Sequence, residues 1–491
     1  RREKMENQTT QKKGFGGWLE KTFSITERNS TVKTEIIAGL TTFFAMCYIV
    51  IVNPNSIAGS AEANPEIWNS VYVGGTIAAV IGTLLMAFVA KRPFAQAAGM
   101  GLNSFFFVSF ILPAMNSNGA LDAKDAYGAG LVIILISGII FMILSVTGLR
   151  KLIATALPDC LKKAISAGIG LFIAFLGAKS AGLVQDNMYT FVQITDFTKI
   201  VDQASWASIG APVISAFLGL ILIAVFAKSK LGFLRKGSII LGIVITSVLY
   251  YLMTWTLPSF DMSNTGKMFS DFAAIGFSAF KPESWKLAFD GVTLGSVFSV
   301  LMTMVGFLLV DMFDTIGTLY GTCSQAGMLN ENGDPDRLDQ CLLCDSIGTV
   351  AGAMLGTSTI TTFVESASGV AEGGRTGFAS VITALGLLLC LFLSPLAMLI
   401  PSVATAPALM YVGVLMLRNF ASVDMSDIRF AVPSFLTMFF MPMTYSISNG
   451  IGVGAIAYVL ITLLTGKYTR KDIVVTVIAI LFALRFAFIS M

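Results

Sequence analysis

Apolar runs long enough to cross a lipid bilayer recur along almost the whole chain of 491 residues. An α-helix needs about 17–25 mostly apolar residues to span the hydrocarbon core of a bilayer. The composition agrees with this interpretation, because 55% of the residues are hydrophobic and only 12% are charged. Those charges are too few to cover the surface of a soluble globular protein of this size. The sequence therefore predicts an all-α polytopic membrane protein.

The apolar runs divide the chain into about 14 predicted transmembrane segments, joined by short connections. They lie at 33–54, 70–90, 95–113, 126–148, 163–184, 208–227, 237–256, 294–320, 341–356, 358–372, 376–400, 404–418, 432–448 and 449–465. A further apolar stretch at 473–490 either lies on the membrane surface or adds a span. Arg485 inside this stretch favours the surface position, since a charge in the membrane core is costly.

Basic residues gather after the second, fourth and sixth segments, while the alternate loops carry few of them. The clusters are Lys91 and Arg92, then Arg150, Lys151, Lys162 and Lys163, then Lys228, Lys230, Arg235 and Lys236. Cytoplasmic loops of membrane proteins carry an excess of lysine and arginine. We therefore expect a cytoplasmic N-terminus and a location in a cell membrane, either plasma or inner.

Two halves of similar length, 33–256 and 294–465, show a weak internal similarity. "LFIAFLGAKSAGLV" (171–184) can be aligned with "MYVGVLMLRNFASV" (410–423), which pairs Lys179 with Arg418. Seven spans in each half is an odd number, so the halves must be inverted relative to the membrane. A 7+7 inverted repeat is typical of transporters that bind substrate near the midplane between broken helices.

The third and tenth segments look discontinuous, because each combines an extended stretch with a short helix. The tenth, "GTSTITTFVESASGVAEGG", opens with β-branched residues that prefer extended backbone and continues with small residues. The third, "PFAQAAGMGLNSFFFVSF", places Gly99 and Gly101 where they permit close backbone approach. We expect the two extended pieces to pair as short antiparallel strands at mid-membrane, buried inside protein.

Glu365 follows the β-branched run and starts the predicted half-helix of the tenth segment. The free N–H groups at a helix start favour an anion, and an ionisable group inside a membrane is usually functional. Asn103 takes the matching place in the third segment, and small residues including Ser368 leave room for a ligand beside Glu365. Phe105 and Phe363 are the aromatic candidates for substrate binding, although Phe105 is also suited to the core.

The eighth segment, "LLVDMFDTIGTLYG", carries further polar candidates on one helix face. Asp311 and Asp314 are i,i+3 neighbours, and Thr318 follows Asp314 by one turn. The similar "DSIGT" that begins at Asp345 is interpreted as a helix cap. Burial near a second carboxylate disfavours the charged form of an acid, and the chain has no histidine. We therefore expect proton coupling to use Asp314 and Glu365, with Asp311 as the next candidate.

Four stretches in order resemble the signatures of the AzgA-like purine permeases: "TEIIAGLTTFFAMCYIVIVNP", "GMGLNSFFF", "DMFDTIGTL" and "FVESASGVAEGGRTG". This group belongs to the nucleobase transporter superfamily, which includes the bacterial uracil permease. The resemblance extends from about Thr31 to the end of the chain. It implies proton-coupled import of adenine, guanine or hypoxanthine, with an elevator-like movement of a core domain against a gate domain.

The resemblance also implies roles for single residues and boundaries for the domains. Asn103, Asp311, Asp314, Glu365 and Ser368 match the family's substrate and coupling positions, and Thr318 stands where the uracil permease has a histidine. The expected divisions are a cytoplasmic tail at 1–30, core at 31–150 and 291–402, and gate at 151–290 and 403–491, the last including the C-terminal helix.

The residues leave the exact cargo open. Guanine and hypoxanthine present an N1–H donor that an ionised carboxylate accepts, whereas adenine presents an acceptor at N1 and wants a protonated acid or an amide. A second reading is an anion transporter or channel of the same fold, which would favour a cationic or neutral pocket. A sodium-coupled nucleobase carrier is a third, because carboxylates also bind sodium.

An enzyme is not expected, because the chain has no histidine, no cluster of metal ligands and no activated nucleophile. The expected partners are a purine nucleobase, protons and membrane lipid. No nucleic acid, cofactor or metal is expected. The oligomeric state stays open, with a homodimer as one option.

Overall fold

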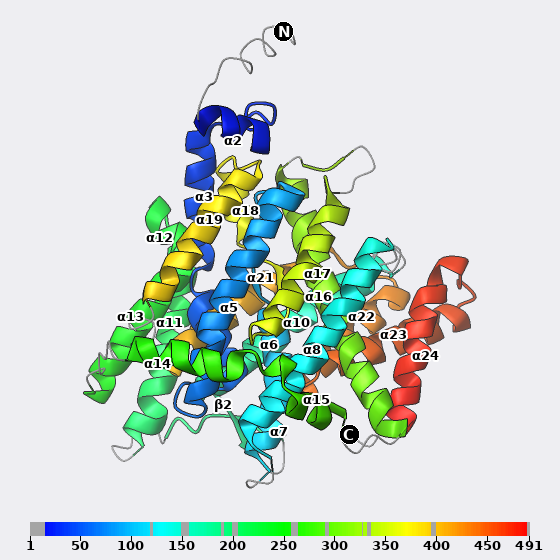
Figure 1. Cartoon of the computed structure of the whole chain (residues 1–491). Helices are drawn as coiled ribbons and strands as arrows, with labels where there is room; N and C mark the ends of the chain where they lie inside the picture. Colours follow the sequence, from blue (N-terminus) through cyan, green and yellow to red (C-terminus); the bar gives the residue numbers. More distant parts are fainter. Residues whose placement is uncertain are drawn as a thin grey trace.

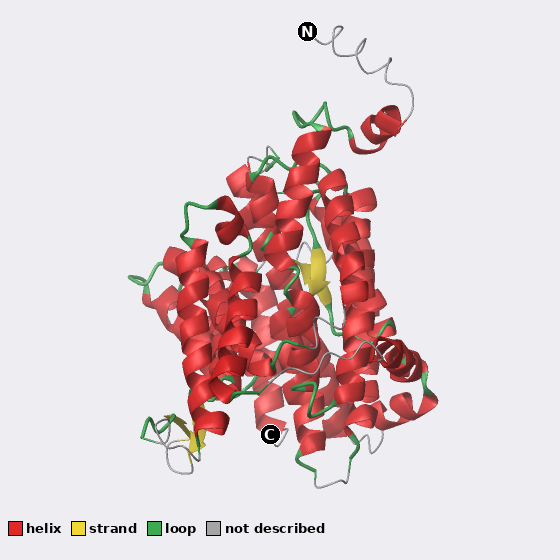
Figure 2. Ribbon diagram, turned by 90° about the vertical axis from the view of Figure 1, so that its left-hand side faces the viewer, coloured by secondary structure: helices red, strands yellow, loops and turns green. Residues whose placement is uncertain are grey.

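The computed structural model describes residues 15–117, 121–148, 157–187, 191–198, 205–256, 264–289, 294–326, 328–330, 335–393 and 399–488. Within these ranges the protein is a bundle of helices that surrounds a short pair of strands (Figures 1 and 2). Arg150 and Lys151, used above for the orientation, lie outside the described residues. The predicted class, a predominantly helical membrane protein, is confirmed.

Five stretches of the described chain are long and apolar enough to cross a membrane by length and composition. They are Val32–Ala58, Pro65–Ala90, Ala123–Val146, Asp159–Ser180 and Trp206–Ala227. Shorter apolar helices, such as Ser238–Thr254 and Gly377–Leu393, accompany them. A total of 14 spans remains a prediction.

One group of helices packs around the two broken segments. It contains α3 (Val32–Met46), α4 (Ile49–Ala58), α5 (Pro65–Leu85) with η1 (Met86–Ala90), α6 (Met100–Phe106) with η2 (Phe107–Ile111) and α7 (Leu112–Met115), α8 (Ala123–Val146), α16 (Leu294–Ala326), α17 (Leu338–Met354), α18 (Ser366–Ala371), and α19 (Gly377–Cys390) with η6 (Leu391–Leu393). Helix α3 contacts α18 and α19, α5 contacts α17 and α19, and α8 contacts α16 and α17.

A second group packs beside the first. It contains α10 (Asp159–Ser180), η3 (Trp206–Gly210) with α11 (Ala211–Ala227), α12 (Gly232–Lys236), α13 (Ser238–Thr254), α21 (Ser402–Leu417) with η7 (Arg418–Ser422), α22 (Ile428–Met443), α23 (Ile447–Leu464), η8 (Arg470–Asp472) and α24 (Ile473–Phe488). Helix α10 contacts both α21 and α22, and α11 contacts α13 and α21. Helix α24, the stretch left ambiguous by the sequence, packs against α23 and also contacts α16.

Short elements connect or cover these groups. They are α2 (Phe15–Phe23), the hairpin of β2 (Val184–Asn187) and β3 (Phe191–Ile194), and α14 (Asn264–Asp271), η4 (Phe272–Gly276), η5 (Ser278–Phe280) and α15 (Pro282–Phe289). Helix α14 crosses the bundle in Figure 1. The β2–β3 hairpin was not predicted, because this loop was treated as a plain connection.

The two broken segments meet as predicted. Strand β1 (Gln96–Ala98) pairs antiparallel with β4 (Ile360–Thr362), with Ala97 opposite Thr361. Further backbone hydrogen bonds join Gly99 N–H to the Thr359 carbonyl at 3.1 Å and Phe363 N–H to the Ala95 carbonyl at 3.0 Å. The pair lies inside the bundle (Figure 2), where its backbone groups are satisfied by each other instead of by water.

The first predicted segment, 33–54, is not one continuous helix. Helix α3 ends at Met46, α4 begins at Ile49 and continues to Ala58, and Cys47 and Tyr48 form the break. At the junction Val50 N–H bonds the Cys47 carbonyl and Ile51 N–H bonds the Tyr48 carbonyl, both over three residues instead of four. Tyr48 is fully buried at this break, and its hydroxyl group has a buried partner.

Candidate functional site

A cavity of about 730 Å³ lies between the two groups of helices. That volume is within the range of about 300–1,000 Å³ that is usual for small-molecule sites. From the first group the lining includes Met100, Asp314, Thr318, Phe363 and Glu365; α10, α13 and α21 supply the opposite walls. The cavity therefore has one wall that carries acids and hydroxyl groups and one that belongs to the other helix group.

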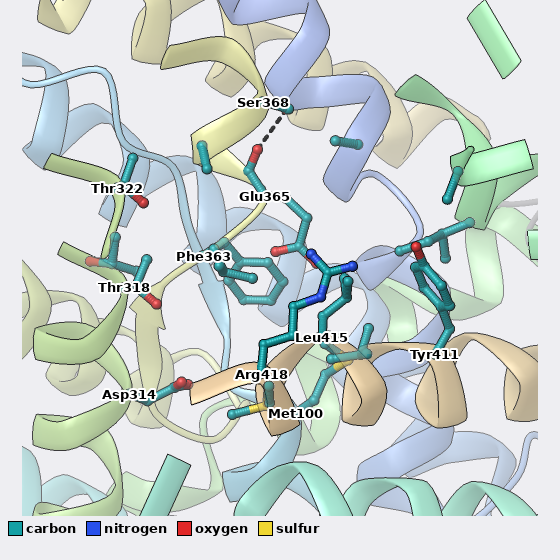
Figure 3. A pocket seen from close by; sticks show the side chains of 18 of the residues that line it. Met100, Asp314, Thr318, Thr322, Phe363, Glu365, Ser368, Tyr411, Leu415 and Arg418 are labelled. Carbon is teal, nitrogen blue, oxygen red and sulfur yellow. Dashed lines mark hydrogen bonds between the residues drawn. The ribbon is translucent and has the colours of Figure 1, made fainter. Parts of the chain in front are cut away.

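Glu365 lies at the first turn of α18 and its side chain enters the cavity (Figure 3). The side chain is buried, with 9% of its surface exposed. The hydroxyl group of Tyr48 donates a hydrogen bond of 2.5 Å to Glu365 Oε1. The Ser368 hydroxyl donates to the backbone carbonyl of Glu365 at 2.6 Å, which closes the turn. The hydrogen bond from Tyr48 therefore fixes the position of one carboxylate oxygen of Glu365.

The position of Glu365 depends on close packing between α18 and α3. At Gly369, one turn after Glu365, an added Cβ would lie 2.2 Å from Thr42 Oγ1 and 2.5 Å from the Ala38 carbonyl oxygen. Only glycine therefore fits this contact without a shift of the helices. The close approach brings the start of α18 next to the break at Tyr48.

Helix α16 supplies the second polar part of the lining. Asp314, Thr318 and Thr322 lie one turn apart on the face that meets the cavity (Figure 3). Asp314 is partly buried and Thr318 is buried. The expected common face of Asp314 and Thr318 is therefore present.

Asp311 lies on the same helix but outside the cavity lining. It accepts a hydrogen bond of 3.0 Å from the Thr349 hydroxyl group of α17. In return the Thr315 hydroxyl group of α16 donates to Asp345 Oδ1 of α17 at 2.6 Å and lies 2.7 Å from Thr361 Oγ1 of β4. All five side chains are buried. The capping interpretation of Asp345 is wrong, because this residue lies within α17 and bonds across to the neighbouring helix.

Asn103 and Phe105 also lie outside the lining of this cavity. Asn103 is inside α6, four residues after the capping position Gly99, so it does not take the same place as Glu365 at the start of α18. Its amide donates to Asn53 Oδ1 at 2.9 Å and accepts from the Ser358 hydroxyl group. The ring of Phe105 packs on Phe307, with centroids 4.5 Å apart. Two of the residues singled out for substrate binding are therefore engaged within the helix group.

Three residues near the cavity were not assigned a role from the sequence. Tyr411 and Arg418 reach the cavity from α21 and η7, opposite Glu365 (Figure 3). Tyr48 donates a hydrogen bond to the carboxylate of Glu365. A usable signal for Tyr48 existed, since a tyrosine hydroxyl group inside an apolar span needs a buried partner.

The cavity offers carboxylate acceptors that can also carry protons, together with hydroxyl and guanidinium donors. Glu365 and Asp314 come from different elements and line the same cavity, together with Phe363. Among the residues that the structure describes, no three histidine, cysteine or acidic side chains form a group able to hold a metal ion.

Two broken segments that meet at a strand pair, with a polar cavity beside them, define a membrane transport protein. The chain belongs to the Permease family, which it matches over residues 33–453. It is 35% identical to the adenine permease AdeP of Escherichia coli (strain K12), over 99% of this chain and 100% of that protein. It is 36% identical to the guanine/hypoxanthine permease PbuG of Bacillus subtilis (strain 168), over 95% of this chain and 99% of that protein. The resemblance to the purine permeases is confirmed.

Solved structures show the same fold at low sequence identity. The transmembrane domain of the cyanobacterial bicarbonate transporter BicA matches with a TM-score of 0.58 at 14% identity, over 86% of this chain and 97% of that one. The murine anion transporter Slc26a9 in the inward-facing state matches with a TM-score of 0.57 at 12% identity, over 92% of this chain and 73% of that one. At these identities the similarity concerns the fold alone.

Proposed function

We propose that this permease imports purine nucleobases together with protons. The observation that carries the proposal is the placement of two carboxylates, Glu365 and Asp314, in one cavity beside Phe363. Ionised carboxylates accept N–H donors of a purine edge, and an aromatic ring can stack on its face. Relatives that match nearly the full chain are named adenine permease and guanine/hypoxanthine permease, which supports the substrate class.

In this proposal Asp314 is the principal proton carrier and Glu365 reads the substrate. Thr318, Ser368 and Phe363 complete the substrate site. Asn103, Asp311 and Phe105 act from within the helix group, by holding its parts together. The carboxylates carry the coupling because the chain has no histidine.

Transport proceeds by movement of a core domain, the first helix group, against a gate domain, the second. Packing supports this division, because the cavity lies between the groups and the strand pair lies within one of them. Arg235 of α12 lines the cavity, and α12 lies towards the end of the bundle that carries α2 (Figure 1). With a cytoplasmic N-terminus, as the positive-inside rule indicates, the cavity opens inwards.

An anion transporter is the second candidate function. Arg235 and Arg418 line the cavity, and the structural neighbours include a bicarbonate transporter and an anion transporter. Glu365 and Asp314, which lie nearer the strand pair, argue against an anion transporter, since they would repel an anion. A sodium-coupled purine carrier is the remaining alternative.

The test is uptake into proteoliposomes that contain the purified protein. Labelled hypoxanthine, guanine and adenine should accumulate under an imposed proton gradient, and a protonophore should abolish accumulation. Excess unlabelled purine should compete, while sulfate and bicarbonate should not. Accumulation that follows a sodium gradient and ignores the proton gradient would show that sodium, instead of the proton, is the coupling ion. Uptake of the anions without uptake of purine would refute the proposal.

A further inference from the structure

The hydrogen bond between Tyr48 and Glu365 constrains what the carboxylate can offer to a ligand. Tyr48 is fully buried, at 0% exposure, and its hydroxyl group lies 2.5 Å from Glu365 Oε1. A tyrosine O–H in such a place is a donor, and a charge-assisted bond to an ionised carboxylate is stronger than one to a neutral group. The contact therefore favours Glu365 as an acceptor.

The backbone on both sides of the Tyr48–Glu365 hydrogen bond brings the two residues close together. Tyr48 occupies the break between α3 and α4, where the helix tightens to bonds over three residues. On the other side, Gly369 lets α18 approach α3 closely. The packing of these helices therefore places the two side chains within hydrogen-bond distance of each other.

Four other charged groups line the same cavity as Glu365: Asp314, Glu372, Arg235 and Arg418. Asp314 lies on the α16 wall and disfavours a second negative charge, whereas Arg418 approaches from the opposite wall and favours one (Figure 3). Glu372 and Arg235 add one charge of each sign. Tyr48 carries no charge, and its hydroxyl group contacts the Glu365 carboxylate directly as a hydrogen-bond donor.

Purines differ at the edge that such an acceptor would meet. Hypoxanthine and guanine carry a donor at N1, which an ionised carboxylate accepts. Adenine carries an acceptor at N1, so it needs a donor such as a protonated acid or an amide. A carboxylate that acts only as an acceptor therefore binds 6-oxopurines more tightly than adenine. Opposite the N1 acceptor of adenine, both buried polar groups would lack a hydrogen-bond donor.

We propose that Tyr48 is a positioning residue that keeps Glu365 a hydrogen-bond acceptor and thereby makes the site select 6-oxopurines over adenine. The proposal rests on the proposed purine transport and adds to it the choice of cargo and the residue that determines it.

The experiment measures equilibrium binding of labelled hypoxanthine and labelled adenine to the purified full chain. The wild type should bind hypoxanthine more tightly. Tyr48→Phe should weaken hypoxanthine binding by about tenfold or more, the usual effect of losing a bond to a charged group, while adenine binding stays unchanged or improves. The ratio of the two affinities is the decisive readout, because a merely structural role would weaken both ligands equally.

Tyr72→Phe is the matched control. Tyr72 is also a buried tyrosine, but its hydroxyl group donates to the Cys390 carbonyl at 2.7 Å, outside the cavity lining. This variant should leave the affinity ratio at the wild-type value. Should Tyr48→Phe fail to fold, Glu365→Gln is the second test. Tyr48 would donate to the amide oxygen of the new glutamine, and its NH₂ group would face the ligand. The ratio of the two affinities should then shift towards adenine.

An unchanged ratio in Tyr48→Phe, or in Glu365→Gln where the first variant does not fold, overturns the inference. So does a wild-type preference for adenine. Purine binding of any kind in the wild type keeps the proposed transport function intact in these cases. Absence of binding by hypoxanthine, guanine and adenine alike would instead overturn the proposed function.

Discussion

Gly101 lies where α6 of the proposed core meets α10 of the proposed gate, and we expect a side chain there to stop transport. A Cβ added at Gly101 would lie 2.6 Å from Ile169 Cγ2, and 3.7 Å from the Cδ1 atoms of Ile173 and Ile447. Three isoleucines from two gate helices thus pack against a single core glycine. In the proposed mechanism, movement of the core past the gate requires this contact to form and separate repeatedly.

The size of the effect follows from the overlap. Apolar carbon atoms prefer a separation of about 3.5–4.0 Å, so the new Cβ would overlap Ile169 Cγ2 by about 1 Å. The β-branched side chain of Ile169 is stiff at χ1 and cannot readily turn away within a helix. Overpacking of this kind costs about 1–3 kcal/mol, which corresponds to about a 5- to 150-fold change in the population of the state seen here. Gly101→Val adds two further methyl groups and belongs at the upper end.

The assay compares purine uptake into proteoliposomes for Gly101→Val, Gly101→Ala, the double variant Gly101→Ala with Ile169→Ala, and the control Gly266→Val. No atom lies within 4 Å of a Cβ at Gly266, so the control should transport normally. The double variant should transport better than Gly101→Ala alone, because the second change removes the clashing methyl group. Normal uptake by Gly101→Val, or a double variant as slow as Gly101→Ala, would refute the reasoning.

Three further predictions concern the polar residues. Glu365→Gln should weaken binding of hypoxanthine and guanine about tenfold or more, since a bond to a charged partner is lost; unchanged affinities in a binding titration would remove Glu365 from the site. Asp314→Asn should abolish accumulation driven by an imposed pH gradient while sparing exchange of labelled for unlabelled purine, and normal accumulation would show that the proton travels elsewhere. Thr315→Val should lower the stability of the purified protein by about 1–3 kcal/mol, because Asp345 loses a buried donor. In thermal unfolding the exposed control Thr147→Val should stay close to the wild type, and equal melting temperatures for both variants would contradict this account.

The strand pair could be predicted from the sequence because its causes are local. A run of β-branched residues before Glu365 prefers extended backbone, and glycines in the third segment allow a close neighbour. The start of the half-helix at Glu365 and the common face of Asp314 and Thr318 follow from helix periodicity in the same way. These features required no knowledge of distant partners.

Other features depend on contacts between segments that are far apart in sequence. The break at Tyr48 contains neither proline nor glycine, and its partner Glu365 lies 317 residues away. Asn103 faces Asn53 instead of the cavity, which the spacing within its own short helix does not reveal. Asp345 resembles a helix cap in sequence, but its donor comes from α16. Tertiary hydrogen bonds decided each of these cases.

The crossed threonine and aspartate bonds between α16 and α17 have a consequence for the energetics of the cycle. Thr315 and Thr349 also touch β4, through Thr361 Oγ1 and the Ile360 carbonyl, so the strand that leads to Glu365 is fastened to the helix that carries Asp314. If these residues travel as one rigid piece, the cargo meets Glu365 and Asp314 at the same spacing whichever way the cavity opens. The contribution of these two carboxylates to the affinity for the cargo is then equal on the two sides of the membrane, so they favour neither uptake nor release. In the proposed function the direction of net flow is then set by the gradients, and reversing them should reverse the flow of the same cargo.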